Sequence, residues 1–91
     1  MAFTREEAVA RARADLAERL GLKESEIAEQ AVEDADFPDA NFGASGPDEM
    51  SAQMITPGWR IRLRAKGGEH EYRANKDQVR LYNYKGDNYR L

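Results

Sequence analysis

A strict alternation of apolar and basic residues from Trp59 to Lys66 constrains this chain more than any other feature. The stretch reads WRIRLRAK, which separates the two residue types onto opposite faces of a β-strand. Gly67-Gly68 follows and predicts a two-residue hairpin loop, because both loop positions can require positive φ. We therefore expect a hairpin with an apolar inner face and a basic outer face. The inner residues are Trp59, Ile61, Leu63 and Ala65, and the outer residues are Arg60, Arg62, Arg64 and Lys66.

The predicted loop also sets which residues face one another across the hairpin. Counting outward from Gly67-Gly68 places Arg64 opposite Glu71 and Arg62 opposite Arg73. Like charges directly opposite each other destabilise a sheet unless an anionic group lies nearby. The pair Arg62 and Arg73 therefore indicates a surface that meets something acidic.

An amphipathic helix is predicted over residues 4–20. Thr4 and Glu7 form the pattern of a capping box, and apolar residues then recur at steps of three and four. Gly21 ends the helix, because glycine readily adopts the left-handed conformation that follows a last turn.

The remaining chain predicts short extended segments separated by loops. Residues 27–36 indicate an edge strand, and residues 38–49 form a long polar loop of a kind that is often functional or mobile. We further predict a short strand at 50–56, a corner at Pro57-Gly58, a third sheet strand at about 78–84, and a turn with a short tail after it.

These elements predict an α+β fold in which one N-terminal helix packs on a three- or four-stranded antiparallel sheet, with the hairpin sheet at about residues 50–84. A chain of 91 residues is long enough for one domain, residues 1–91, with a thin core. We expect Trp59 to belong to that core.

Composition restricts the setting and the partners. The chain has no cysteine, and neither a signal peptide nor a membrane span is recognisable, so we expect a cytoplasmic protein. Residues 1–58 contain 5 Lys or Arg and 13 Asp or Glu, a net of −8, whereas residues 59–91 contain 9 and 4, a net of +5. The halves either complement one another or leave a basic sheet face for an acidic partner.

The sequence contains little that indicates a catalytic site or a metal site. The one histidine, His70, has no serine or carboxylate placed beside it by any pattern, and we interpret it as structural. The stretch DADFPDAN contains oxygen ligands suited to calcium, but its spacing differs from an EF-hand and Pro38 interrupts it. We therefore expect no enzyme activity, no metal and no cofactor.

The runs FPDANFG, AQMITPGWRIRL and GGEHEYR resemble a group of small, poorly characterised bacterial α+β domains. The resemblance covers most of residues 5–81 and implies a fold without an activity. Members often carry two cysteines, at places that correspond here to Ala44 and about Tyr82. More loosely, the order of elements is similar to PepSY-like and cystatin-like domains. Residues Gln53–Gly58 resemble the cystatin hairpin motif Gln-x-Val-x-Gly, with one extra residue and an internal proline.

We predict a non-catalytic protein-binding domain that docks through the basic outer face and the adjoining loop. The alternatives are a cystatin-like protease inhibitor that uses the Gln53–Gly58 corner and a weak nucleic-acid binder, with arginines on phosphates and tyrosines on bases. Membrane binding is not expected, and the chain should be a monomer or a weak homodimer. The predicted partner-binding residues are Arg60, Arg62, Arg73, Pro57, Gly58, Asn41 and Phe42.

Overall fold

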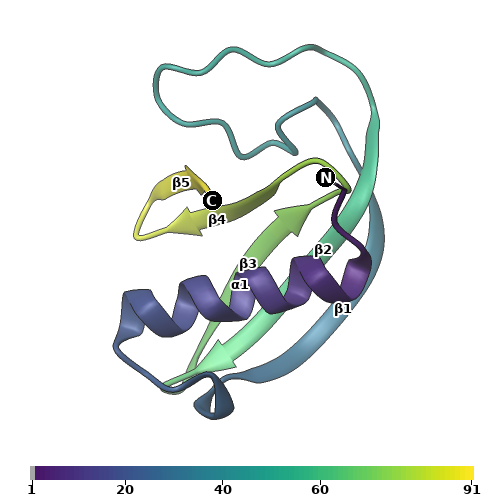
Figure 1. Cartoon of the computed structure of the whole chain (residues 1–91). Coiled ribbons are helices and arrows are strands. Elements are labelled where there is room, and N and C mark those ends of the chain that lie inside the picture. The colour runs from purple at the N-terminus through teal and green to yellow at the C-terminus, as the bar shows by residue number, and fades with distance from the viewer. Residues whose placement is uncertain (1) are drawn as a thin grey trace.

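The computed structural model describes residues 2–91, which form one α-helix packed on a five-stranded antiparallel sheet. The strands lie side by side in chain order, and the helix α1 crosses one face of the sheet (Figure 1). This confirms the α+β class, with five strands where three or four were predicted. The elements are α1 (Arg5–Leu20), the 3-10 turn η1 (Glu24–Glu26), β1 (Ala28–Phe37), β2 (Thr56–Ala65), β3 (Gly68–Ala74), β4 (Val79–Tyr84) and β5 (Asp87–Arg90).

The helix begins and ends where its sequence signals predict. The Glu7 N–H donates to Thr4 Oγ1 at 3.1 Å, and the Thr4 N–H donates to Glu7 Oε1 at 2.9 Å, which completes the capping box. Gly21 follows the last turn in the left-handed conformation, with φ of 66°. No helix within residues 2–91 is long and apolar enough to cross a membrane.

The core lies between α1 and the inner face of the sheet. Tyr72 is fully buried there, and its hydroxyl donates to Asp15 Oδ2 on the helix at 2.8 Å. Burial and this hydrogen bond raise the pKa of Tyr72 far above its ordinary value. Trp59 is only half-buried at the margin of the core, so it contributes less apolar burial than predicted. The other large core residues are Leu16, Ile61, Leu63, Val79 and Leu81.

The hairpin between β2 and β3 forms, but its loop lies one residue earlier than predicted. Lys66 and Gly67 occupy the loop with φ of 50° and 74°, and Gly68 pairs with Ala65. Positive φ at both loop residues defines a type I′ turn, whose twist matches that of the flanking strands. Lys66 adopts this left-handed conformation although it is not a glycine.

This one-residue change in the loop moves every cross-strand partner by two residues and leaves the faces unchanged. Arg62 therefore faces Glu71, and the like-charge pair is Arg60 with Arg73 rather than Arg62 with Arg73.

The predicted strand at 50–56 and the predicted corner at Pro57-Gly58 are both wrong. Residues 50–55 belong to a loop, and β2 begins at Thr56 and continues straight through Pro57 and Gly58 in register with β1. A Cβ at Gly58 would collide with the carbonyl oxygen of Ala74. The glycine therefore permits close approach of two strands rather than a turn.

The predicted C-terminal tail is instead a strand. Lys85 and Gly86 form a second tight turn with φ of 52° and 89°, and β5 pairs with β4 after it. The Leu91 N–H also donates to the Val79 carbonyl at 3.0 Å. Lys-Gly at both hairpins shows that the turn conformation tolerates lysine at its first position in this chain.

Candidate functional site

The loop that joins β1 to β2, residues 38–55, extends beyond the end of the sheet (Figure 1), and its first part packs against the outer face of the sheet. Phe42 and Ala44 are completely buried, and the ring of Phe42 lies 5.1 Å from the ring of Phe37. Phe42 adopts a φ of 61°, which turns its side chain inward at some conformational cost. We call residues 38–55 the β1–β2 loop.

Arg80 anchors this loop to the sheet. Its side chain is 1% exposed, and its two terminal nitrogens donate to the Glu49 carboxylate at 2.7 and 3.0 Å. The same guanidinium donates to the Ala44 carbonyl at 3.2 Å. Hydrogen bonding to Arg80 lowers the pKa of Glu49 to about 2. Arg80 is thus the most deeply buried charge in the described chain.

Arg73 holds the loop at a second point. Its Nη1 donates to the Phe42 carbonyl at 2.8 Å, and its Nε donates to Glu71 Oε2 at 2.6 Å. The guanidinium also lies 3.5 Å from the centre of the Tyr82 ring, in cation–π contact. These contacts leave 14% of the Arg73 side chain exposed, so this predicted binding residue has a structural role as well.

Arg60 and Arg62 are more accessible, and glutamates of the same chain pair with them. Arg60 Nε lies 3.5 Å from Glu71 Oε2, and Arg62 Nη1 lies 3.3 Å from Glu33 Oε1. Their side chains are 31% and 37% exposed. Glu71 therefore supplies the anionic group that the like-charge pair requires, which reduces the positive charge available to an external partner.

The polar residues of the loop stabilise its own conformation. Asp39 Oδ1 accepts hydrogen bonds from the N–H groups of Asn41 and Gly43 at 2.9 and 3.0 Å, and from Ser51 Oγ at 3.1 Å. These bonds, led by the one from Gly43, lower the pKa of Asp39. Asn41, a predicted binding residue, is half-buried and donates to Ser45 Oγ at 3.1 Å. This network fixes the base of the loop.

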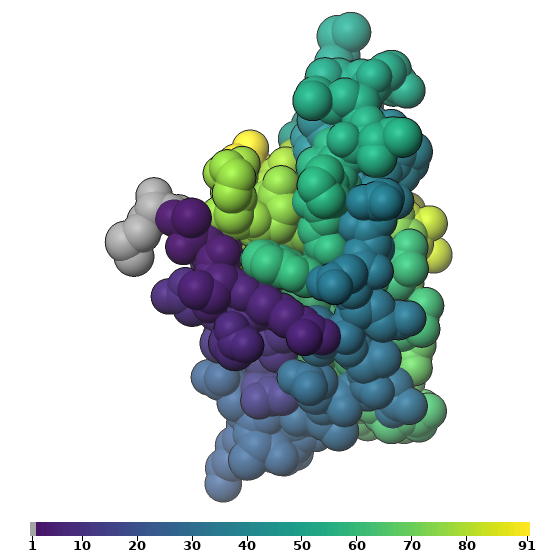
Figure 2. All heavy atoms as spheres, turned by 90° about the vertical axis from the view of Figure 1, so that its right-hand side faces the viewer, coloured from purple at the N-terminus to yellow at the C-terminus, as the bar shows by residue number. Residues whose placement is uncertain are grey.

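The later part of the loop carries apolar side chains into solvent. Met50 is 96% exposed, Met54 58% and Ile55 73%. Figure 2 shows the corresponding teal-green part of the chain projecting beyond the end of the sheet. A folded domain exposes single apolar residues routinely, but three large ones within six positions are typical of an interaction surface.

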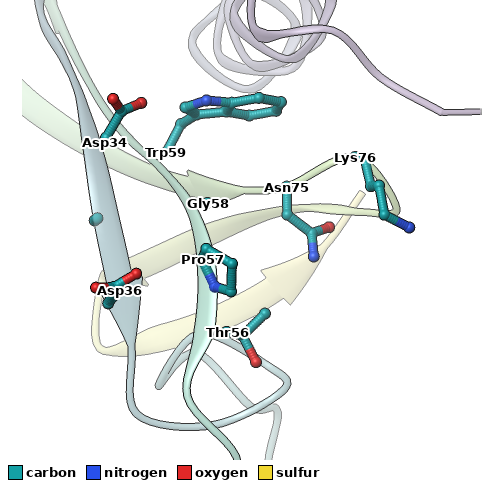
Figure 3. Close-up of a pocket in the computed structure, with 9 residues that line it drawn as sticks. Asp34, Asp36, Thr56, Pro57, Gly58, Trp59, Asn75 and Lys76 are labelled. Atoms are coloured by element: carbon teal, nitrogen blue, oxygen red, sulfur yellow. The ribbon is translucent and has the colours of Figure 1, made fainter.

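A cleft of about 610 Å³ opens on the α1 side of the sheet, beside the first residues of β2 (Figure 3). Trp59 and Pro57 of β2 and Asp34 and Asp36 of β1 line it from two adjacent strands. These residues share one face because Asp34 pairs with Trp59 and Asp36 with Pro57. The cleft is also lined by Ala35, Thr56, Gly58, Asn75 and Lys76.

His70 lies at the opposite end of β3, half-buried, with its ring 5.9 Å from that of Tyr84. Burial lowers its pKa because it penalises the charged imidazolium. Among residues 2–91, no three His, Asp or Glu side chains gather in a way that could hold a metal ion.

Comparison with known proteins identifies a family but assigns no activity or ligand to it. No curated protein and no solved structure matches the chain. One family model matches residues 9–83, which include most of the helix, the loop, strands β1 to β3 and all but the last residue of β4. The chain therefore belongs to the family described as "Domain of unknown function (DUF8738)".

Proposed function

We propose that this chain is a non-catalytic protein-binding domain. Its docking surface consists of Met50, Met54 and Ile55 of the β1–β2 loop, together with the adjoining start of β2 at Pro57 and Gly58. The observation that carries the proposal is the exposure of these three large apolar side chains on a loop that is otherwise well ordered by internal contacts. Arg60 and Arg62 lie on the neighbouring outer face and supply the polar rim.

Solvation of these side chains is unfavourable, so a partner that covers them gains from their burial. Each fully buried methionine or isoleucine side chain contributes roughly 1.5–3 kcal/mol relative to its exposed state. Methionine also adapts its shape readily, which suits contact with a protein surface.

The base of the loop reduces the entropic cost of such binding. Arg80 fixes Glu49 on one side of the exposed segment, and Asp39 fixes Ser51 within it. The Ala40 N–H also donates to the Ala52 carbonyl at 3.0 Å. A loop that is held in this way before binding loses less conformational freedom when the partner arrives.

The test is affinity capture from cell lysate with matched variants. We expect Met54→Ser with Ile55→Ser to abolish capture of any partner that the unmodified domain retains reproducibly. Gln53→Ser, an exposed change in the same loop, is the control. Equal capture by the double variant and the control would exclude the loop as the docking surface.

Charge reversal tests the rim separately. Arg60→Glu with Arg62→Glu should weaken capture, whereas Arg64→Glu, an exposed change on the same strand and face but farther from the loop, should not. If both changes act equally, net charge rather than a docking rim is responsible.

Protease inhibition is the second candidate. The β1–β2 loop joins two antiparallel neighbours and presents apolar side chains just before Pro57 and Gly58, as an inhibitory wedge would. Inhibition of a panel of cysteine proteases, lost in the Met54→Ser, Ile55→Ser variant, would support it. Absence of inhibition by the unmodified domain would exclude it for that panel.

The nucleic-acid alternative has a different signature. Binding through arginines and phosphates should weaken steeply as salt concentration rises, because counterions are released from the nucleic acid. The glutamate partners of Arg60 and Arg62 give this alternative no added support.

A further inference from the structure

We propose that the cleft beside Trp59 receives an arginine side chain of the protein partner. The guanidinium would stack on the Trp59 indole and pair with Asp34 and Asp36. This inference rests on the proposed function, because it assigns the partner's chemistry at a second contact next to the loop.

The shape of the cleft fits a long side chain with an apolar stem. Its volume of about 610 Å³ lies within the range of small-ligand sites, and Pro57 and Trp59 provide apolar walls. Figure 3 shows the Trp59 ring extending over the space beside Pro57 and Asn75. An arginine stem can pack on such walls while its charged head stays near the polar rim.

The carboxylates that line the cleft favour a positively charged ligand. Asp34 and Asp36 are both exposed on the cleft side of β1, and neither has an ion-pair partner among the described residues. Lys76 also lines the cleft, but its ammonium pairs with Asp77 at 3.2 Å. Strand β1 carries four acidic residues and no Lys or Arg, which extends the negative potential along the edge of the sheet.

A planar guanidinium fits this combination better than a lysine ammonium does. It stacks on an aromatic face and donates a fork of hydrogen bonds to carboxylates at the same time. The protein already contains such an arrangement, since Arg73 stacks on Tyr82 at 3.5 Å and donates to Glu71 at 2.6 Å. In the cleft, the aromatic and the carboxylates are present without the arginine.

Trp59 is the only tryptophan, so its fluorescence reports on the cleft directly. The probe is an acetylated and amidated Gly/Ser peptide with one central arginine, titrated to millimolar concentration. The matched peptide carries citrulline, which has nearly the same shape and no charge. We expect a saturable fluorescence change with the arginine peptide and about tenfold weaker binding of the citrulline peptide, because stacking and charged hydrogen bonds are lost together.

Variants assign the effect to the two carboxylates. Asp34→Asn and Asp36→Asn should each weaken binding of the arginine peptide by about tenfold, since each removes a charge without changing shape. Glu33→Gln is the control, because it removes the same charge from β1 on the opposite face. Amide shifts of Asp34, Asp36 and Asn75 in NMR spectra give a second reading that does not depend on tryptophan.

Three results would overturn the inference: no saturable change, equal binding of the citrulline peptide, or an equal effect of Glu33→Gln. N-acetyl-arginine amide should bind about as tightly as the peptide, because all the proposed contacts come from the arginine side chain. Tighter binding of free L-arginine than of the peptide would mean that the site recognises a small guanidinium compound, and the partner assignment would fail. Failure of the peptide test, with capture still dependent on Met54 and Ile55, would remove this inference and leave the proposed function in place.

Discussion

The two faces of the sheet are built by different physical means. The inner face buries Ile61, Leu63 and Leu81 under α1, and the Tyr72 hydroxyl adds a hydrogen bond to Asp15 within this contact. The outer face is covered in part by the β1–β2 loop, and there the buried anchor is a charged residue, Arg80. Apolar burial holds the first contact, whereas an ion pair and hydrogen bonds to backbone carbonyls hold the second.

This difference teaches where the fold is robust and where it can respond to conditions. Apolar packing is insensitive to pH and salt, and it scales with the area removed from water. The ion pair of the outer face depends on the ionisation of Glu49 and on complete satisfaction of a buried guanidinium. The loop that presents Met54 and Ile55 should therefore loosen before the core unfolds.

The largest effect is expected on the inner face. Leu63→Ala should reduce the free energy of unfolding by about 3 kcal/mol, because it removes a fully buried side chain and leaves a cavity. Urea unfolding followed by circular dichroism measures this change. Arg64→Ala, the exposed neighbour on the other face, should change stability by less than about 0.5 kcal/mol; similar losses in both variants would contradict the assignment of faces.

The outer anchor should be the next most sensitive point. Glu49→Gln should cost about 2 kcal/mol, because glutamine keeps a hydrogen bond but leaves the charge of buried Arg80 without its counter-ion. Asp48→Asn, an exposed change next to it, is the matched control. Hydrogen exchange should show the loss within the β1–β2 loop first, and faster exchange in α1 alone would refute the anchor.

Acid should remove the contribution of the Glu49–Arg80 ion pair to the stability of the unmodified protein. The pKa of Glu49 is lower in the folded state than its ordinary value of 4.5, so the ionised carboxylate stabilises the fold above that value. This stabilisation is lost as pH falls from 4.5 toward about 2. The stability difference between the unmodified protein and Glu49→Gln should shrink over that interval, and a difference independent of pH would contradict the linkage.

The smallest effect is expected at the exposed ion pairs. Arg62→Gln should lower the free energy of unfolding by less than about 1 kcal/mol, because Arg62 and Glu33 are both substantially solvated. Thermal unfolding at low and high salt measures it, and salt should reduce the already small difference. A loss as large as that of Glu49→Gln would mean that the outer face is less solvated than its exposure indicates.

Local signals predicted the elements that local physics decides. The capping box at Thr4 and the glycine at Gly21 bound the helix, because these residues satisfy the free backbone groups of its ends. Alternation from Trp59 to Ala65 gave the correct inner face. The predicted pairing register of the β2–β3 hairpin was wrong. Gly67-Gly68 and Lys66-Gly67 are both acceptable loops, and the pairing of the strands beyond the turn decides between them.

The candidate site was predictable only in part. Pro57 and Gly58 do lie at the cleft, but as strand residues. Asp34 and Asp36 belong to the edge strand predicted at 27–36, and no pattern in the sequence indicated that they would line a cleft with Trp59. Phe42 and Arg73 read as surface residues and are largely covered. Their burial depends on the path of an 18-residue loop, residues 38–55, which no local pattern specifies.

The sequence by itself determined the helix, the strand faces and the α+β class, because capping, periodicity and turn preference act over a few residues. Only the tertiary structure decided that Arg80 is buried against Glu49 and that Glu71 pairs with three arginines. It also decided that Trp59 borders a cleft with two aspartates that have no ion-pair partner among residues 2–91. These features join residues that are distant along the chain, and their energies depend on desolvation, which is set by what the completed fold places around each charge.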